Sequence, residues 1–227
     1  MIIYLSPAKV LNFSQPSRSP IKICFAEKTE HLFQTAKSLS KTQLQSELVI
    51  SDKLAERVYS YYQQPQPTFK PLELFSGEAF KALDYGSLSS KHQQKAKERI
   101  YIGDAFYGLI KGTHIIAPYR LDFTKPFNEI NLYAYWKTTV QSQFDRPIVD
   151  LSSMEYHQLL PHYLDHPQVR IDLVKGSSFL RKTFRGRVAR AIIEQNIDQL
   201  SELNRLSVPG FKFYDQTKSH LYYISED

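Results

Sequence analysis

The stretch MIIYLSPAK (residues 1–9) decides which kind of fold the sequence predicts. Residues 2–5 form a short apolar run that ends before Pro7, which is typical of a strand that leads into a loop. Further strands are predicted in the segments 146–153 and 169–174, where apolar side chains again gather or alternate. Segments with helical spacing lie between these strands, so strands and helices alternate along the chain.

The remaining pattern completes this picture. A strand that begins at residue 72 is expected to lead through Gly77 into a helix, and a strand that begins at residue 100 to lead through a turn into another. Residues 114–123 look like a strand broken at Pro118. The other helices are predicted at 27–46, 51–62, 89–99, 132–144 and 186–205, with a hairpin at 210–225. We therefore predict an α/β (mixed α+β) fold: one domain over residues 1–227, with a central mixed sheet flanked by helices.

Composition narrows the class of protein. Of 227 residues, 42% are hydrophobic and 23% charged, which is a globular composition, while 8 Gly and 12 Pro argue against a collagenous or disordered chain. The N-terminus lacks a charged region before its apolar run, and no run approaches the roughly 18 apolar residues of a membrane helix. A single cysteine, Cys24, excludes an intrachain disulfide and fits a reducing compartment. A cytoplasmic protein without membrane contact is expected.

A basic stretch near the C-terminus suggests an anionic partner. Residues 175–193 hold six basic residues and no acid, which equals the net charge of +6 for the whole chain. If a helix begins near residue 186, its free N–H groups and dipole favour an anion there. Lys182 and Arg185 would stand just outside this end and Arg190 one turn inside. The alternative is a solvated basic face, in which Arg190 pairs with Glu194 four residues later.

Two further basic residues lie after or within strand-like segments. Lys9 comes after the first strand, where α/β proteins place ligand contacts, and the alternative is that it pairs with a carboxylate such as Asp52 or Glu155. Arg120 would share a strand face with Asp122, which leaves open an internal ion pair or a cleft arginine that binds an anion.

Other candidate sites have plainer explanations. Ser152 and Glu155 have the spacing of a helix capping box, and the sequence lacks the G-x-S-x-G turn of a serine hydrolase. Trp136 has the spacing of a core residue on a helix, although it could stack on an unpaired base. The absence of GxGxxG, P-loop and CxxC motifs leaves NAD, ATP and iron–sulfur cofactors without support, so no cofactor is predicted.

A histidine-rich segment raises the question of a metal site. His157, His162 and His166 lie within ten residues of each other, together with Asp165. Pro161 interrupts any helix that would align them, and their spacing fits no zinc signature. We therefore predict no metal site. Imidazoles and carboxylates do suit iron or zinc, so metal binding by these three histidines is kept as the alternative.

Nine short blocks, in order, resemble the YaaA family of bacterial peroxide-stress proteins. The combination of SPAK, PYRL and RG…R…II in register is the most specific part of this resemblance. The basic positions of the family block match Lys182, Arg185 and Arg190, but not Arg181 or Arg187. The blocks are LSPAKVL (5–11), ISDKLAERV (50–58), LFSGEAF (74–80), YGLI (107–110), APYRLDF (117–123), LYAYW (132–136), VDLSSMEY (149–156), RGRVARAIIEQN (185–196) and GFKFYD (210–215).

The resemblance implies a cytosolic, single-domain protein of mixed α/β fold. It implies a role in surviving hydrogen peroxide by limiting free iron and oxidative DNA damage, and DNA binding through a basic cleft and a helix-hairpin-helix-like element. No enzymatic reaction is securely assigned to such proteins. The chain departs from the family at residues 104–108, where Asp-Ala-Phe-Tyr-Gly replaces the usual Ser-Gly-Leu-Tyr-Gly.

We therefore expect a peroxide-stress protein that binds duplex or branched DNA without sequence specificity. Lys182, Arg185 and Arg190 would neutralise phosphates, with Lys9 and Arg120 in the same cleft. The alternative is an enzyme that acts on a phosphorylated or otherwise anionic small substrate, in which Lys9, Arg120 and Glu155 converge on a pocket. A third hypothesis is an iron-binding protein that uses the histidine-rich segment.

Overall fold

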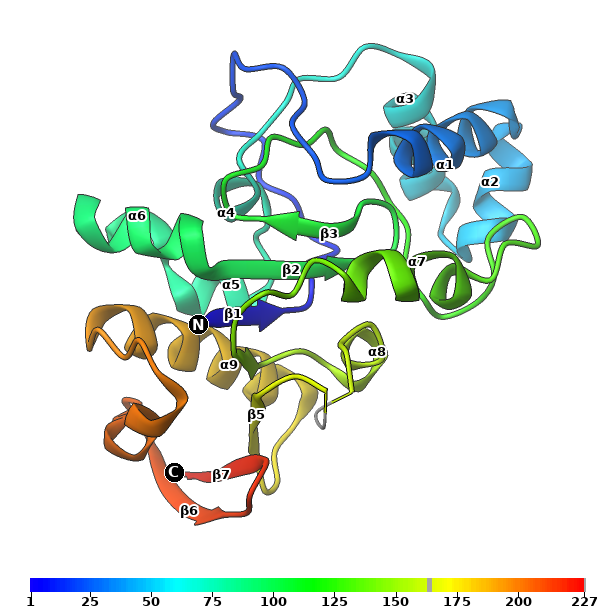
Figure 1. Ribbon diagram of the computed structural model, residues 1–227. Coiled ribbons are helices and arrows are strands. Elements are labelled where there is room, and N and C mark those ends of the chain that lie inside the picture. Colours follow the sequence, from blue (N-terminus) through cyan, green and yellow to red (C-terminus); the bar gives the residue numbers. More distant parts are fainter. Residues whose placement is uncertain (163–164, 227) are drawn as a thin grey trace.

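The structure is a computed structural model that describes residues 1–162 and 165–226. One seven-stranded sheet draws its strands from almost the whole chain, and helices lie on both sides of it (Figure 1). The α-helices are α1 (Ala26–Ser38), α2 (Lys41–Leu48), α3 (Asp52–Gln63), α4 (Pro71–Leu74), α5 (Glu78–Leu83), α6 (Ser90–Arg99), α7 (Leu132–Gln141), α8 (Met154–His157) and α9 (Ser178–Glu194), with 3-10 helices η1 (Tyr85–Ser87) and η2 (Leu200–Arg205).

The sheet has the order β3-β2-β1-β4-β5-β7-β6. Its inner strands are parallel, and the hairpins β2–β3 and β6–β7 add an antiparallel strand at each edge. The mixed α/β fold class predicted from the sequence is therefore confirmed. The strands are β1 (Ile2–Leu5), β2 (Ile100–Asp104), β3 (Gly108–Lys111), β4 (Ile148–Asp150), β5 (Gln168–Leu173), β6 (Phe211–Gln216) and β7 (His220–Ser225).

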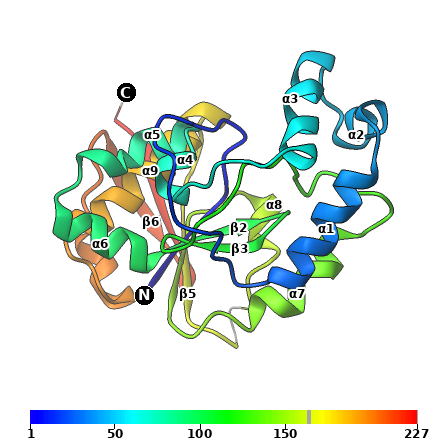
Figure 2. The same cartoon turned by 90° about the horizontal axis from the view of Figure 1, so that it is seen from above.

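Strand β1 lies inside the sheet, between β2 and β4, and both of its faces are covered. All four of its residues are buried, as expected for a parallel strand between two helical layers. Seen from above, α5, α6 and α9 lie on one side of the sheet, and α7 and α8 lie on the other (Figure 2). Trp136 of α7 is fully buried, and its indole N–H donates to the carbonyl of Ala105, so its predicted core role is confirmed.

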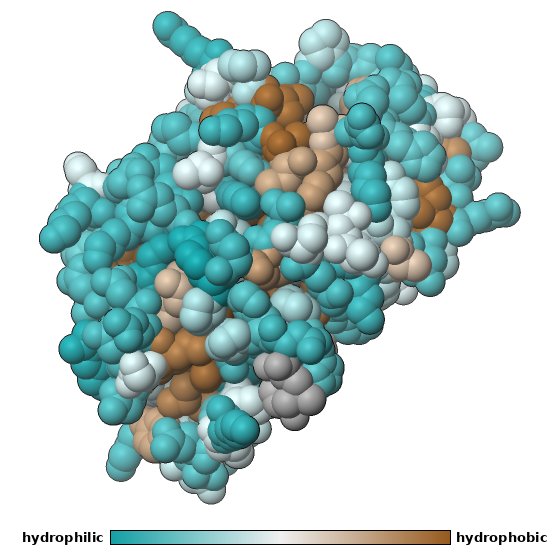
Figure 3. All heavy atoms as spheres, viewed as in Figure 1, coloured by the Kyte–Doolittle hydropathy of each residue, from teal (hydrophilic) through white to brown (hydrophobic). Residues whose placement is uncertain are grey.

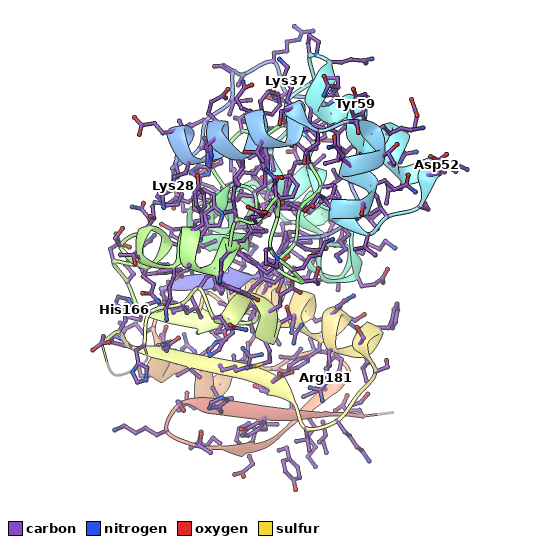
Figure 4. The ribbon with its side chains drawn as sticks, turned by 90° about the vertical axis from the view of Figure 1, so that its right-hand side faces the viewer. Lys28, Lys37, Asp52, Tyr59, His166 and Arg181 are labelled. Atoms are coloured by element: carbon purple, nitrogen blue, oxygen red, sulfur yellow. The ribbon has the colours of Figure 1, made fainter. Side chains whose placement is uncertain are left out.

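Helices α1 to α3 form a separate layer beyond the sheet. Figure 4 shows Lys28, Lys37 and Tyr59 in this layer, at the opposite end of the molecule from Arg181. Hydrophilic side chains cover most of the face in Figure 3, with smaller hydrophobic patches between them. The described part of the chain holds no helical segment with the length and apolar character that a transmembrane span requires.

The chain order creates a crevice at one end of the sheet. After β1 the chain places β2 on one side of it, and later returns to place β4 on the other side. The carboxyl ends of β1 and β4 therefore lie next to each other at a point where the direction of winding reverses. Ligands of open α/β sheets bind outside the strands at such a switch point.

Several predicted elements differ from the structure. The strand predicted before Gly77 is the short helix α4, which has Pro71 in its first turn, and the helix predicted at 27–46 is divided into α1 and α2, because Ser40 caps a new start.

Residues 100–110 form the hairpin β2–β3 and contain no helix, because Asp104 Oδ1 accepts the N–H groups of Phe106 and Tyr107 and so closes a tight turn. Gly108 follows with a φ of 71°. The predicted strand at 114–123 is reduced to isolated bridges at Ile115 and Ile116.

The long helix near the C-terminus is also shifted from its predicted bounds. It spans Ser178–Glu194 and not 186–205, since the side chain of Ser177 accepts the N–H of Leu180 and caps an earlier start. Gly186 therefore lies inside α9. A Cβ atom there would lie 2.0 Å from the carbonyl oxygen of Ala79, so glycine is needed where α9 crosses α5. The predicted anion site at the N-terminus of a helix beginning at 186 does not exist.

Candidate anion-binding cleft

A cleft of about 320 Å³ opens at the carboxyl ends of β1 and β4. Its wall includes the loop after β1, the start of α5, residues 119–121, the segment from Leu151 to Tyr156, and one face of α9. Four of the five predicted site residues line it: Lys9, Arg120, Lys182 and Arg185. They come from three regions that are distant in the sequence, so the fold gathers these cations around one cavity.

Arg185 is the least satisfied cation of this group. Its side chain is 13% exposed, and its Nε is buried with no hydrogen-bond partner among the described residues. Its ion pair with Asp172 is long, with 4.0 Å between Nη2 and Oδ2. Burial, only partly offset by Asp172, lowers the pKa of Arg185 from its ordinary value. A buried guanidinium with unused donors gains free energy when an anion enters beside it.

Asp172 cannot neutralise Arg185 fully, because two other arginines share it. Arg181 Nη1 lies 3.0 Å from Asp172 Oδ1, and Arg170 Nη2 lies 3.5 Å from Oδ2. Arg181, at the start of α9 in Figure 4, also donates to the carbonyl of Leu173 at 2.7 Å. Arg181 is therefore held by structural contacts, whereas Arg185 faces the cleft with part of its charge unbalanced.

Lys9 and Arg120 connect the opposite wall. Lys9 Nζ lies 2.7 Å from Asp122 Oδ2. Lys9 therefore pairs with a carboxylate, but with Asp122 and not with Asp52 or Glu155, the partners considered from the sequence. Arg120 Nη1 donates to the carbonyl of Lys9 at 3.3 Å. These contacts fasten the loop after β1 to residues 120–122. The Lys9 side chain remains 56% exposed, so its ammonium can still donate to a ligand.

Glu155 adds a carboxylate to this basic wall. Its Oε1 accepts the N–H of Phe123 at 3.0 Å, and burial raises the pKa of Glu155 above its ordinary value. The predicted capping box with Ser152 is wrong: the cap residue of α8 is Ser153, and Ser152 is fully buried. The hydroxyl of Ser152 donates to Asp150 Oδ1 at 2.6 Å, which keeps it out of the cleft.

Comparison with known proteins places the chain in a family. A family model described as peroxide stress protein YaaA matches residues 1–217. The chain belongs to the YaaA family. A UPF0246 protein of Finegoldia magna is 29% identical over 230 residues, covering 95% of this chain and 93% of the relative. A UPF0246 protein of Shewanella sp. (strain W3-18-1) is 27% identical over 246 residues and covers 95% of each chain.

Arg190 is the third basic residue on α9 that matches the YaaA block, and the structure places it outside the cleft lining. Its Nη1 donates to the carbonyls of Leu83 and Asp84 and to Ser87 Oγ, at 2.9–3.1 Å. Its Nη2 lies 2.8 Å from Glu194 Oε1, which is the ion pair considered from the sequence. Arg190 therefore ties α9 to the end of α5.

Two histidines of this YaaA-family chain have different hydrogen-bond partners. His157 Nδ1 lies 2.7 Å from Asp150 Oδ2, and His166 Nε2 lies 2.6 Å from the carbonyl oxygen of Arg146. His157 and His162 line a second cavity together with Asp165. Within residues 1–162 and 165–226, no three His, Cys, Asp or Glu side chains meet in a way that could hold a metal ion.

Three charged residues in or beside the cleft were not predicted from the sequence. Glu78 and Lys81 also line the cleft, and they pair with each other at 2.8 Å. Asp172 sets the charge around Arg185. A signal for Asp172 was present, because strand alternation in 169–174 places Arg170 and Asp172 on one face, shortly before the basic stretch.

Proposed function

We propose that this YaaA-family protein binds DNA through the basic cleft and in this way limits oxidative damage during peroxide stress. A backbone phosphate would enter the cleft and accept hydrogen bonds from Arg185, with Lys182, Lys9 and Arg120 around it. The observation that carries the proposal is the buried Arg185 guanidinium, whose Nε has no partner among the described residues and whose carboxylate is shared. Arginine is suited to this role because its planar fork donates two parallel hydrogen bonds to phosphate.

The size of the cleft limits how DNA would lie. A volume of about 320 Å³ accommodates a phosphate with its sugar, but not a section of duplex. A duplex would therefore lie across the opening and place one phosphate inside. Contacts of this kind fix position and carry no sequence information, so binding without sequence specificity is expected. Glu78 and Glu155 oppose an anion, but five basic side chains line the same wall.

A second candidate is an enzyme or binding protein for a small anionic substrate. The observation in its favour is that Lys9, Arg120 and Glu155 line one cleft at the switch point of the sheet. The volume lies at the lower end of the range for small-molecule sites, roughly 300–1,000 Å³. Glu155, whose pKa is raised by burial, would be the candidate acid or base.

Equilibrium binding distinguishes the two candidates. Fluorescence anisotropy with labelled duplex and branched DNA, and calorimetry with deoxythymidine monophosphate, would be performed on the parent and on Arg185→Ala. DNA binding that weakens in Arg185→Ala and is much tighter than binding of the mononucleotide supports the DNA function. Saturable mononucleotide binding without DNA binding supports the small-substrate function and contradicts the first proposal.

A further inference from the structure

A second cavity, of about 500 Å³, lies apart from the cleft. Its wall is formed by α7, by α8 and the residues that follow it, and by the first residues of β5 and β7. Among the residues that the structure describes, none lines both cavities. The polar side chains on its wall include Lys137, His157, Gln168, Arg170 and His220. Neither the family assignment nor the proposed DNA contact uses this cavity.

A polar row runs across the sheet beside this cavity. The register pairs Asp150 of β4 with Arg170 of β5, and Arg170 with His220 of β7, so the three side chains share one face. Asp150 is 1% exposed and forms an ion pair with Arg170. The buried carboxylate is thus held in place. Its Oδ2 atom, which contacts Arg170, also lies within hydrogen-bond distance of His157.

His157 is fixed in one tautomer by this carboxylate. Its Nδ1 lies 2.7 Å from Asp150 Oδ2, and an ionised carboxylate only accepts hydrogen bonds, so Nδ1 carries the proton. In the neutral ring, Nε2 then presents its lone pair on the side away from Asp150. The side chain is 37% exposed and lines the cavity. His157 therefore offers an oriented acceptor.

Gln168 supplies a second acceptor. Its Nε2 donates to the carbonyl of Pro161 at 2.9 Å, which fixes the orientation of the side-chain amide. Its Oε1 is buried, and no described residue donates to it. A buried carbonyl oxygen without a donor is costly, so a shift of the Gln168 side chain that brings Oε1 to a donor on a ligand would be favoured.

The wall holds one cation whose charge no carboxylate offsets among the described residues. Lys137 is exposed and forms no ion pair there, whereas Arg170 is already paired with Asp150 and Asp172. Asp165 also lines the cavity and is exposed to water. A complementary ligand carries an acid group for Lys137 and hydroxyl or amino donors for His157 and Gln168.

We infer that the second cavity binds a small organic acid that also carries hydroxyl or amino groups. The acid group lies toward Lys137, and a donor of the ligand reaches His157 Nε2 or Gln168 Oε1. This inference does not depend on DNA binding in the cleft.

Malate and succinate test the inference, since malate is succinate with one added hydroxyl. Isothermal titration calorimetry of the parent protein should show saturable binding of L-malate, with succinate weaker by about tenfold because its site leaves an acceptor unpaired. His157→Phe should weaken L-malate binding by about as much. Arg185→Ala, in the other cavity, should leave L-malate binding unchanged. Equal affinity for the two acids, or no binding of either at millimolar concentration, would overturn the inference.

A second readout guards against a variant that fails to fold. In the parent protein, nitrogen NMR of the His157 ring should show the Nε2 resonance moving on addition of L-malate and not on addition of succinate. An Nε2 resonance that ignores L-malate would overturn the inference regardless of how the variant behaves.

Discussion

Arg185 Nη2 lies 4.0 Å from Asp172 Oδ2, and that carboxylate also pairs with Arg170 and Arg181. Three guanidiniums therefore share this carboxylate, and among the described residues Arg170 alone of the three has a second one, Asp150. Asp172 is 20% exposed, so solvent screens these charges only in part. The local excess of positive charge is the physical basis for an anion in this cleft.

Removing the shared carboxylate should destabilise the protein. Asp172→Asn leaves three largely buried arginines with less compensation, and we expect the free energy of unfolding to fall by about 2–4 kcal/mol. Urea denaturation of the parent and variant measures this change. Asp215→Asn, at an exposed position on β6, is the matched control and should change stability by less than about 0.5 kcal/mol. Equal stability of parent and Asp172→Asn would show that Asp172 does not hold the arginines.

Arg190 is expected to matter for stability and not for anion binding. Arg190→Ala removes contacts to Leu83, Asp84 and Glu194, and should lower the free energy of unfolding by about 1–2 kcal/mol. DNA affinity of the folded variant should remain that of the parent. Denaturation and anisotropy on the same preparation test both parts, and a loss of affinity without a loss of stability would place Arg190 in the binding site.

Gly186 should not tolerate a side chain. In Gly186→Ala, the new Cβ would lie 2.0 Å from the carbonyl oxygen of Ala79, so α5 and α9 must separate. We expect a loss of about 1–3 kcal/mol or more, measured by thermal or urea denaturation. Gly86→Ala is the matched control, because nothing lies within 4 Å of its Cβ position. Similar effects for the two variants would contradict the close packing of α5 on α9.

Glu155 should make anion binding depend on pH. Burial raises the pKa of Glu155, so on acidification this group becomes neutral earlier than an exposed glutamate. Anion affinity should rise as pH falls through that pKa, because repulsion from the carboxylate is removed. Folding stability has the same sign: the folded state holds the proton more tightly, so stability falls as pH rises from the unfolded to the folded pKa.

Glu155→Gln isolates this effect. The variant should bind DNA more tightly than the parent at neutral pH, and the part of the pH dependence that is due to Glu155 should disappear. Glu56→Gln, on the exposed surface of α3, should behave like the parent. Anisotropy titrations between weakly acidic and neutral pH decide this, and parallel pH profiles for parent and Glu155→Gln would contradict the role of Glu155.

The sequence predicted the cleft better than it predicted the helix that forms one wall of it. Lys9 was predicted because the end of an apolar strand is a recurrent ligand position, and β1 lies in the sheet as its pattern predicts. Arg120 was predicted from its place beside Asp122 in a strand that the structure reduces to isolated bridges. The start of α9 was missed because Gly186 resembled a helix end. Glycine is needed at position 186 because the backbone of Ala79 packs against it, and no local sequence pattern reveals such a contact.

Partners that come from distant elements could not be predicted. Arg190 is bound by carbonyls more than a hundred residues earlier in the chain, and carbonyl oxygens leave no trace in sequence. Asp122 as the partner of Lys9 likewise depends on how residues 117–122 fold back over the loop after β1. The YaaA blocks indicated which basic positions to inspect, but only the fold separates Arg185 from Arg190.

The most direct test of the central claim is a salt titration. Fluorescence anisotropy with labelled duplex DNA would compare the parent, Arg185→Ala and Arg187→Ala, which removes the same charge from α9 outside the cleft. Affinity should fall linearly in log salt, with a slope shallower by about 0.9 for Arg185→Ala and unchanged for Arg187→Ala. Failure of the parent to bind at low salt, or equal slopes for the parent and Arg185→Ala, would contradict phosphate binding by Arg185.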